Sequence, residues 1–176
     1  MHSKVLLVNK DNKIVGKEDK LIAHKKGLLH RAFSIFVFNN NQEMLIQRRA
    51  DTKYHSAGLW SNACCSHPIK EHNIYKEVQE RLNYEMGITC SLNHAFNFLY
   101  KADMGNGLIE HELDYVYIGT TNNYPRFNMS EVSAIRYQGY QSLKDEMQGN
   151  PNDFTPWFNM IVHKVWKHYL ELFSYA

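Results

Sequence analysis

The sequence predicts an α+β layer fold, because its candidate strands stand on both sides of one strong amphipathic helix. Runs rich in β-branched and aromatic residues occupy 32–38 and 43–47 before that helix and 112–119 after it. The helix itself, over residues 71–86, is indicated by apolar residues that recur every four positions. In a doubly wound sheet strands and helices would alternate along the whole chain, so that fold class is disfavoured.

The first part of the chain predicts a strand and then a hairpin. A short apolar run near the N-terminus leads into a turn at Asp11-Asn12. The four residues NNNQ at 39–42 separate the strand candidates 32–38 and 43–47, and such turn residues between β-rich runs favour an antiparallel pair.

The predicted helix over residues 71–86 has a clear apolar face and a clear end. Ile74, Val78 and Leu82 lie four residues apart, and Gly87 follows as the usual residue beyond a helix C-terminus. Further elements are predicted as strands at 95–101, 112–119 and 132–138, and as helices at 141–148 and from Pro156 to residue 173.

Length and composition predict one domain over residues 1–176 with a buried core, since 44% of the chain is hydrophobic. Its 20 basic and 18 acidic residues are scattered, so neither nucleic acid nor a membrane is an expected partner. The N-terminal apolar run ends after four residues, too short for a signal-peptide core. Three cysteines, two of them adjacent, make a poor disulfide framework and favour a reducing, cytoplasmic location.

The central helix also carries a row of charged residues. Glu77, Arg81 and Glu85 stand at i, i+4 and i+8 beside the apolar stripe. Taken alone, such a row is more often a solvent-exposed ladder of ion pairs than a functional site.

The stretch NACCSHP over residues 62–68 places two thiols beside an imidazole. Its chemistry fits half of a disulfide, a cluster of zinc ligands, or a catalytic thiol next to a metal-binding histidine. The residues alone leave these three interpretations open.

The end of the central helix, ERLNYEMGI over residues 80–88, resembles the last part of the Nudix box. With that helix the Nudix superfamily holds divalent metal on a substrate diphosphate. Glu85 and Gly87 match the box, whereas Glu80, Arg81 and Tyr84 stand where it has Arg, Glu and Glu. A hydrolase of this superfamily clusters several of those glutamates around its metals, so the departures argue against hydrolysis.

Longer stretches resemble the type 1 isopentenyl-diphosphate isomerase family. They run in order from about residue 20 to residue 157 and are AHKKGLLHRAFSIFVFN, RRADTK, GLWSNACCSHP, FLYKA, IEHELDYV and TPW. The resemblance implies a Nudix-like α/β/α sandwich with a mixed sheet and one central metal-binding helix. It also implies an isomerase that interconverts isopentenyl diphosphate and dimethylallyl diphosphate in isoprenoid biosynthesis.

Moving a carbon–carbon double bond requires one proton added and another removed, with a carbocation-like state between them. The resemblance assigns these transfers to Cys65 and Glu112, with Tyr100 near the glutamate to relay or orient the proton. It assigns Trp157 to stabilising the cation, because the face of an indole attracts positive charge. Cys64 is expected to be a packed, inert thiol.

The resemblance further implies a divalent ion held by three histidines and two glutamates, namely His24, His30, His67, Glu110 and Glu112. Such ligands suit Zn²⁺ or Mn²⁺, with Mg²⁺ as a further choice. Without the resemblance these residues would carry little weight, because chance pairs are common among ten histidines. Each of the other seven histidines is expected at the surface or in the core.

For the diphosphate, the basic residues of the family match Lys20, Arg49, Lys53 and Arg81, whose charges suit phosphate oxygens. Glu85 is expected to hold a Mg²⁺ that bridges to those oxygens. The expected partner is a small isoprenoid diphosphate, bound by a monomer or weak homodimer. Two other interpretations stay open: a Nudix-type hydrolase of another diphosphate, and a non-catalytic binding module stabilised by its metal.

Overall fold

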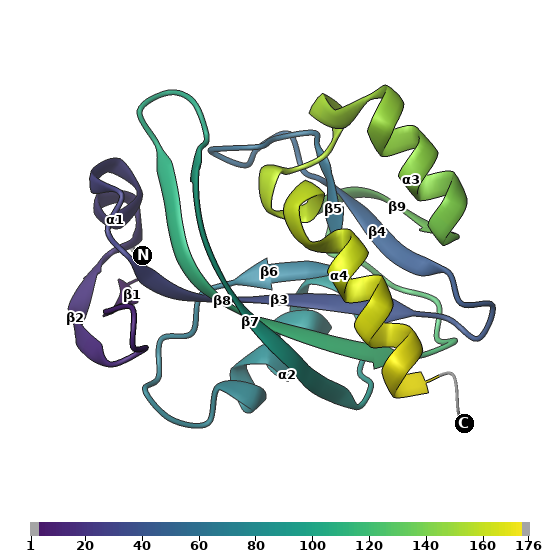
Figure 1. Ribbon diagram of the computed structural model, residues 1–176, viewed down its shortest axis with the longest axis horizontal. Helices are drawn as coiled ribbons and strands as arrows, with labels where there is room; N and C mark the ends of the chain where they lie inside the picture. The colour runs from purple at the N-terminus through teal and green to yellow at the C-terminus, as the bar shows by residue number, and fades with distance from the viewer. Residues whose placement is uncertain (1–3, 174–176) are drawn as a thin grey trace.

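The computed structural model describes residues 4–173, which form a mixed sheet with helices on both faces (Figure 1). The strands are β1 (Lys4–Val8), β2 (Ile14–Asp19), β3 (His30–Phe38), β4 (Met44–Arg49), β5 (Trp60–Asn62), β6 (Cys64–Ser66), β7 (Leu92–Asp103), β8 (Ile109–Thr120) and β9 (Val132–Gln138). The helices are α1 (Lys20–Lys26), α2 (Ile74–Met86), α3 (Tyr140–Gly149) and α4 (Pro156–Phe173), with a 3₁₀ turn η1 (Pro151–Asp153) before α4.

Strand β3 is the centre of the sheet, and every one of its residues is buried. It runs parallel to β8 from the pair His30↔Glu112 to the pair Phe38↔Thr120. Its other neighbours β1, β4 and β6 are antiparallel to it. The sheet is therefore mixed, as predicted. Strand β3 pairs directly with β4, β6 and β8, which contribute residues to the candidate site, and β7 joins the sheet through β8.

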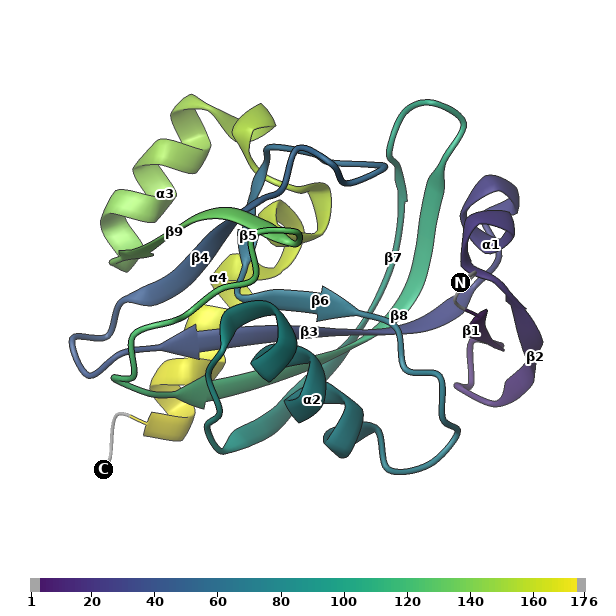
Figure 2. The same cartoon turned by 180° about the vertical axis from the view of Figure 1, so that it is seen from behind.

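The two faces of β3 build two cores, because successive side chains of a strand point to opposite sides. Phe33, Ile35 and Val37 pack with the apolar face of α2, while Phe36 and Phe38 pack with α3 and α4. Helices α3 and α4 lie in front of the sheet in Figure 1, and α2 lies in front when the molecule is seen from behind in Figure 2. The predicted α/β/α sandwich is confirmed.

Helix α2 has the predicted apolar face and the predicted end but begins three residues later than expected, at Ile74 instead of residue 71. Its N-cap Asn73 adopts a left-handed conformation, φ 61°, which interrupts the helix there. The carboxylate of Glu77 accepts hydrogen bonds from the backbone N–H groups of residues 69 and 70, which keeps the preceding loop in a turn. At the other end Gly87 has φ +63°, and a Cβ there would lie 2.5 Å from the carbonyl oxygen of Arg126.

The remaining predictions agree in type and differ in extent. The predicted hairpin is present, but β3 and β4 pair at only two positions before the strands diverge. Strands β7 and β8 extend beyond the predicted 95–101 and 112–119, because they pair with each other along their length. Strand β9 and helices α3 and α4 lie within a residue of their predicted ranges.

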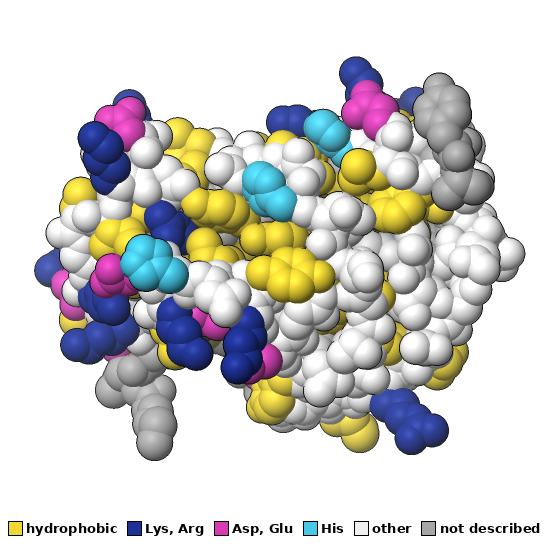
Figure 3. Space-filling model, turned by 90° about the horizontal axis from the view of Figure 1, so that it is seen from below, with side chains coloured by type: hydrophobic (Ala, Val, Ile, Leu, Met, Phe, Trp, Pro, Cys, Tyr) yellow, Lys and Arg dark blue, Asp and Glu magenta, His cyan; other side chains and the backbone are white. Residues whose placement is uncertain are grey.

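Five short elements are absent from the sequence predictions: β2, α1, β5, β6 and the 3₁₀ turn η1. Helix α1 is capped at Asp19, whose Oδ1 accepts hydrogen bonds from the backbone N–H groups of Leu21 and Ile22. On the face shown in Figure 3, Lys and Arg side chains are interspersed with Asp and Glu, in keeping with the near balance of charge in the sequence. Within residues 4–173, no helix combines the length and the apolar character needed to span a membrane.

Candidate active site

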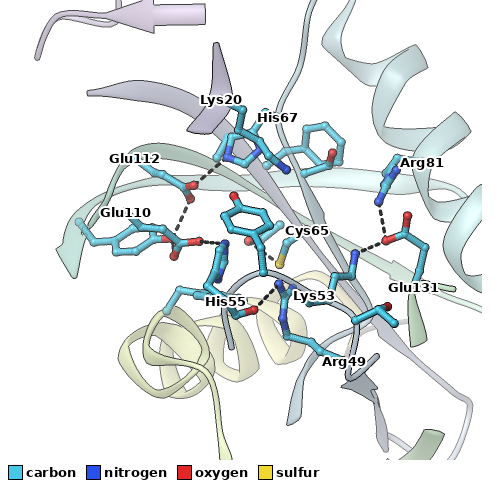
Figure 4. A pocket seen from close by; sticks show the side chains of 18 residues that line it. Lys20, Arg49, Lys53, His55, Cys65, His67, Arg81, Glu110, Glu112 and Glu131 are labelled. Atoms are coloured by element: carbon cyan, nitrogen blue, oxygen red, sulfur yellow. Dashed lines mark hydrogen bonds and ion pairs between the residues drawn. The ribbon is translucent and has the colours of Figure 1, made fainter. Parts of the chain in front are cut away.

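A cavity of about 320 Å³ lies where β3, β6, β7 and β8 meet α4 and the loop that follows β4 (Figure 4). Most of the predicted site residues line it: Lys20, Arg49, Lys53, Cys65, His67, Arg81, Tyr100, Glu110, Glu112 and Trp157. His24, His30 and Glu85 are buried outside its lining. The fold thus brings motifs from both ends of the chain around one space.

Strand β6 separates the two adjacent cysteines by simple alternation. Cys64 is fully buried in the core that faces α2, whereas Cys65 lines the cavity. The Cys65 Sγ lies 3.5 Å from the Ser34 Oγ on the neighbouring strand, and Ser34 donates to Asp114 Oδ2 at 2.7 Å. Burial, together with the nearby Asp114 carboxylate, raises the pKa of Cys65 to about 12. The thiol therefore carries its proton at neutral pH.

Asn62 orients both the thiol and the indole. Its Nδ2 donates to the backbone oxygens of Ile35, at 3.1 Å, and Cys64, at 2.8 Å, which fixes the direction of the amide. Its Oδ1 accepts from Cys65 Sγ at 3.1 Å and from Trp157 Nε1 at 3.2 Å. One buried oxygen thus positions the proposed acid and the proposed cation-stabilising ring.

A second wall of the cavity carries the carboxylates. The Tyr100 hydroxyl oxygen lies 2.7 Å from Glu112 Oε2, to which it donates, and 2.9 Å from Glu110 Oε2. Burial opposes the charge of Glu112, but the neighbouring imidazoles of His30 and His67 outweigh this effect and hold the pKa of Glu112 well below its usual range. Burial and the adjacent Glu112 charge raise the pKa of Glu110 instead. Glu112 is accordingly ionised, and Glu110 holds a proton more readily.

Three imidazoles and a carboxylate converge beside the cavity. The ligand atoms of His24, His30, His67 and Glu112 all lie within 4.8 Å of one another. The Nδ1 of His30 is 2.8 Å from the carbonyl oxygen of Leu28, so this nitrogen carries the hydrogen and leaves Nε2 free to bind a metal. Burial lowers the pKa of His24 to about 3 and that of His67 to about 4, which keeps both rings in the neutral form that metals bind. The group therefore fits a divalent metal ion.

Glu110, the fifth predicted ligand, lies beside this group instead of within it. Its Oε1 is 3.4 Å from His55 Nε2, and its Oε2 contacts Tyr100. The side chain of His55 is only 6% exposed and lines the cavity, although no motif in the sequence distinguishes it from the other histidines. His55 is therefore buried, which agrees with the expectation of a core or surface histidine, and it also faces the cavity.

The basic residues gather at another part of the cavity (Figure 4). Burial lowers the pKa of Lys20, and the charges of Lys53, Arg81 and Arg49 add to this effect. The Arg49 guanidinium lies 5.3 Å from the centre of the Trp157 ring, so the basic cluster adjoins the aromatic wall. Such a cluster suits a polyanionic group, and the neighbouring aromatic wall suits an apolar one.

Glu85 is buried behind Arg81. Its Oε1 lies 2.6 Å from Arg81 Nη2, and its Oε2 accepts a hydrogen bond from Gln47 Nε2 at 3.3 Å. A carboxylate oxygen is a suitable Mg²⁺ ligand, so the residue fits the ion chemically. Because Arg81 already contacts this carboxylate, a Mg²⁺ would compete with Arg81 for it.

Several residues that line the cavity or lie next to it had no signal in the sequence. Their contacts are with residues distant in the chain, which no local pattern reveals. These residues are Ser34, His55, Asn62 and Glu131. The quoted stretch NACCSHP contains Asn62, but only the packing of Trp157 against it reveals why an amide is needed there. Their positions at the site follow from the arrangement of the strands and not from the sequence pattern.

Comparison with known proteins identifies the class. The NUDIX domain profile matches residues 28–158. The crystal structure of a Deinococcus radiodurans protein aligns with a TM-score of 0.68 at 16% identity, covering 84% of this chain and 90% of that one. A MutT protein from Methanosarcina mazei aligns with a TM-score of 0.56 at 15% identity, covering 68% and 81%. These similarities show that the fold is that of a NUDIX domain protein.

Sequence relatives narrow the class to one family. The chain is 42% identical over 163 residues to the isopentenyl-diphosphate Delta-isomerase of Pectobacterium atrosepticum, covering 93% of this chain and 91% of that protein. It is 39% identical over 171 residues to the protein of the same name from Serratia proteamaculans, covering 97% and 96%. This chain therefore belongs to the isopentenyl-diphosphate Delta-isomerase family of NUDIX domain proteins.

The buried histidines predict sensitivity of the metal-free protein to acid. The pKa values of His24 and His55 are lowered to about 3 and that of His67 to about 4, below the ordinary 6.5. Between about pH 6.5 and 4 these three residues bind more protons in the unfolded chain than in the folded one, so their contribution to the free energy of unfolding should fall as the pH falls. Glu110 and Asp114, whose pKa values are raised, contribute with the opposite sign. Urea unfolding of the metal-free protein across this window measures the slope.

Two variants separate the buried histidines from the exposed ones in that experiment. His55→Asn removes one of the three histidine contributions, so the slope of unfolding free energy against pH should decrease by the contribution of one proton, about 1.4 kcal/mol per pH unit. The exposed His72 provides the control, because His72→Asn should leave the slope unchanged. An unaltered slope in His55→Asn would contradict the assignment.

Proposed function

We propose that the protein catalyses the interconversion of isopentenyl diphosphate and dimethylallyl diphosphate. The observation that carries the proposal is that a protonated thiol, Cys65, and an ionised carboxylate, Glu112, line two walls of one cavity (Figure 4). An allylic shift of a double bond needs one proton donor and one proton acceptor at different carbons. The names of the relatives support the same substrate pair.

The residues divide the work between the two ends of the substrate. Lys20, Arg49, Lys53 and Arg81 bind the diphosphate and so fix the position of the hydrocarbon. With the diphosphate held, Cys65 donates a proton to the terminal alkene carbon, and Glu112 removes one from the carbon next to the oxygen-bearing one. In the reverse direction the two residues exchange roles.

The carbocation-like state between these steps is stabilised by the cavity wall. The indole face of Trp157 attracts positive charge without offering a nucleophile that would trap it. Tyr100 bridges the two carboxylates and orients the proton on Glu112. The cavity encloses the hydrocarbon so that water does not quench the cation.

Two ions complete the proposal. His24, His30, His67 and Glu112, with Glu110 beside them, would hold Zn²⁺ or Mn²⁺, or else Mg²⁺. This ion would supply positive charge that orients Glu112 and keeps it ionised. Glu85 would hold a Mg²⁺ that accompanies the diphosphate.

One incubation tests the function against its alternatives. Purified protein with isopentenyl diphosphate and Mg²⁺ should form dimethylallyl diphosphate without releasing phosphate. Phosphate release without the isomer would instead favour a NUDIX-type hydrolase. If neither product forms and metal stays tightly bound, the protein is a metal-stabilised binding module and the proposal is wrong.

A further inference from the structure

Glu131 places a carboxylate among the cations of the cavity. It immediately precedes β9, lines the cavity, and its side chain is 15% exposed. Its carboxylate forms an ion pair with Lys53, and its Oε2 lies 3.0 Å from Arg81 Nη2. Both partners belong to the group proposed to bind the diphosphate. In the free protein the carboxylate of Glu131 therefore takes the hydrogen bonds that these cations would otherwise donate to a diphosphate.

The position of Glu131 is fixed by the backbone around it. Its carbonyl oxygen accepts a hydrogen bond from the N–H of Ala50 at 3.1 Å, next to Arg49 at the end of β4. Its own N–H donates to the carbonyl oxygen of Asn128 at 2.9 Å. The carboxylate is therefore held near the same cations even when they turn toward another anion.

Arg81 joins Glu131 to the buried Glu85. A single nitrogen, Arg81 Nη2, lies 2.6 Å from Glu85 Oε1 and 3.0 Å from Glu131 Oε2. If Arg81 and Lys53 turn to bind a diphosphate, both carboxylates lose hydrogen bonds from a cation and face additional negative charge. Leaving a partly buried charge without its partner is costly, and a nearby like charge adds to the cost.

We propose that Glu131 is an internal anion that occupies the diphosphate-binding cations in the free protein and makes diphosphate binding depend on a divalent cation. The inference rests on the proposed function, since it concerns the same basic cluster. A divalent cation that arrives with the diphosphate compensates the carboxylates that Arg81 and Lys53 release. Without a divalent cation a diphosphate binds more weakly, because nothing replaces Arg81 and Lys53 as partners of the carboxylates.

Calorimetric titration with inorganic pyrophosphate tests this role without relying on turnover. Metal-free wild-type protein and Glu131→Gln are each titrated in the absence and in the presence of Mg²⁺. Glutamine keeps the size and a hydrogen-bond acceptor but removes the charge. We expect Glu131→Gln to bind metal-free pyrophosphate about tenfold more tightly than wild type, and its gain in affinity from Mg²⁺ to shrink by a similar factor. Glu131→Ala should show the same shift if the charge is responsible.

Glu146→Gln is the matched control. Glu146 also pairs with an arginine, its Oε1 lying 2.6 Å from Arg136 Nη2, but it lies outside the lining of the cavity. Its replacement should leave pyrophosphate binding unchanged. An equal gain from Mg²⁺ in wild type and Glu131→Gln would overturn this inference alone. Failure of wild type to bind pyrophosphate even with Mg²⁺ would overturn the proposed function as well.

Discussion

Replacement of Cys65 by alanine should lower kcat for isomerisation by at least about 10³-fold, with little change in KM. The thiol lines the cavity, carries its proton at neutral pH and is oriented by Asn62. Its hydrogen bonds are to Ser34 and Asn62 and not to the cations proposed to bind the diphosphate, so binding of the substrate should persist. Rates of conversion followed by NMR at several substrate concentrations separate kcat from KM.

The neighbouring Cys64 supplies the control for that experiment. It is the same residue type one position away, but alternation along β6 sends it into the core on the other face of the sheet. Cys64→Ala should cost about 1–2 kcal/mol of stability through the small void it leaves, and kcat should stay close to the wild-type value. Comparable losses of activity in both variants would show that packing, not proton transfer, explains the effect.

Replacement of Glu112 by glutamine should be equally severe, with kcat reduced by about 10³-fold or more. The amide keeps the shape of the side chain, but it cannot take up the proton. The change also removes the anionic member of the group formed with His24, His30 and His67. Bound divalent metal, measured by elemental analysis after dialysis, should therefore fall together with the activity.

Glu110→Gln separates the two carboxylates. Because burial and the Glu112 charge raise the pKa of Glu110, the glutamine resembles the state that Glu110 already favours. Its loss of activity should therefore be at least about tenfold smaller than that of Glu112→Gln. Near-normal turnover by Glu112→Gln would refute its role as the base.

Local patterns in the sequence were sufficient for the longer elements. The spacing of Ile74, Val78 and Leu82 predicts the face of α2 that packs on the sheet, and Gly87 predicts its end. The structure adds the reason for glycine, since a side chain there would clash with Arg126. Short elements escaped prediction because three residues, as in β5 and β6, are too few to show a period. Helix α1 had a capping residue and a terminal glycine, but its seven residues show no extended apolar stripe.

Only part of the candidate site, likewise, can be predicted from the sequence. The family resemblance assigns Cys65, Glu112 and the metal-binding histidines to one site. The strand register explains how two of them come together, because His30 lies opposite Glu112 across the parallel pair of β3 and β8. Asn62 and Glu131 could not be assigned in advance. Their roles depend on which side chains face them, and no spacing along the chain encodes that.

The position of deuterium in dimethylallyl diphosphate formed from isopentenyl diphosphate in deuterated water directly tests proton transfer by Cys65. One deuteron is expected in a methyl group, delivered by the exchanged Cys65 thiol. Isomer formed at the normal rate by Cys65→Ala, or isomer free of deuterium from the wild-type protein, would contradict it.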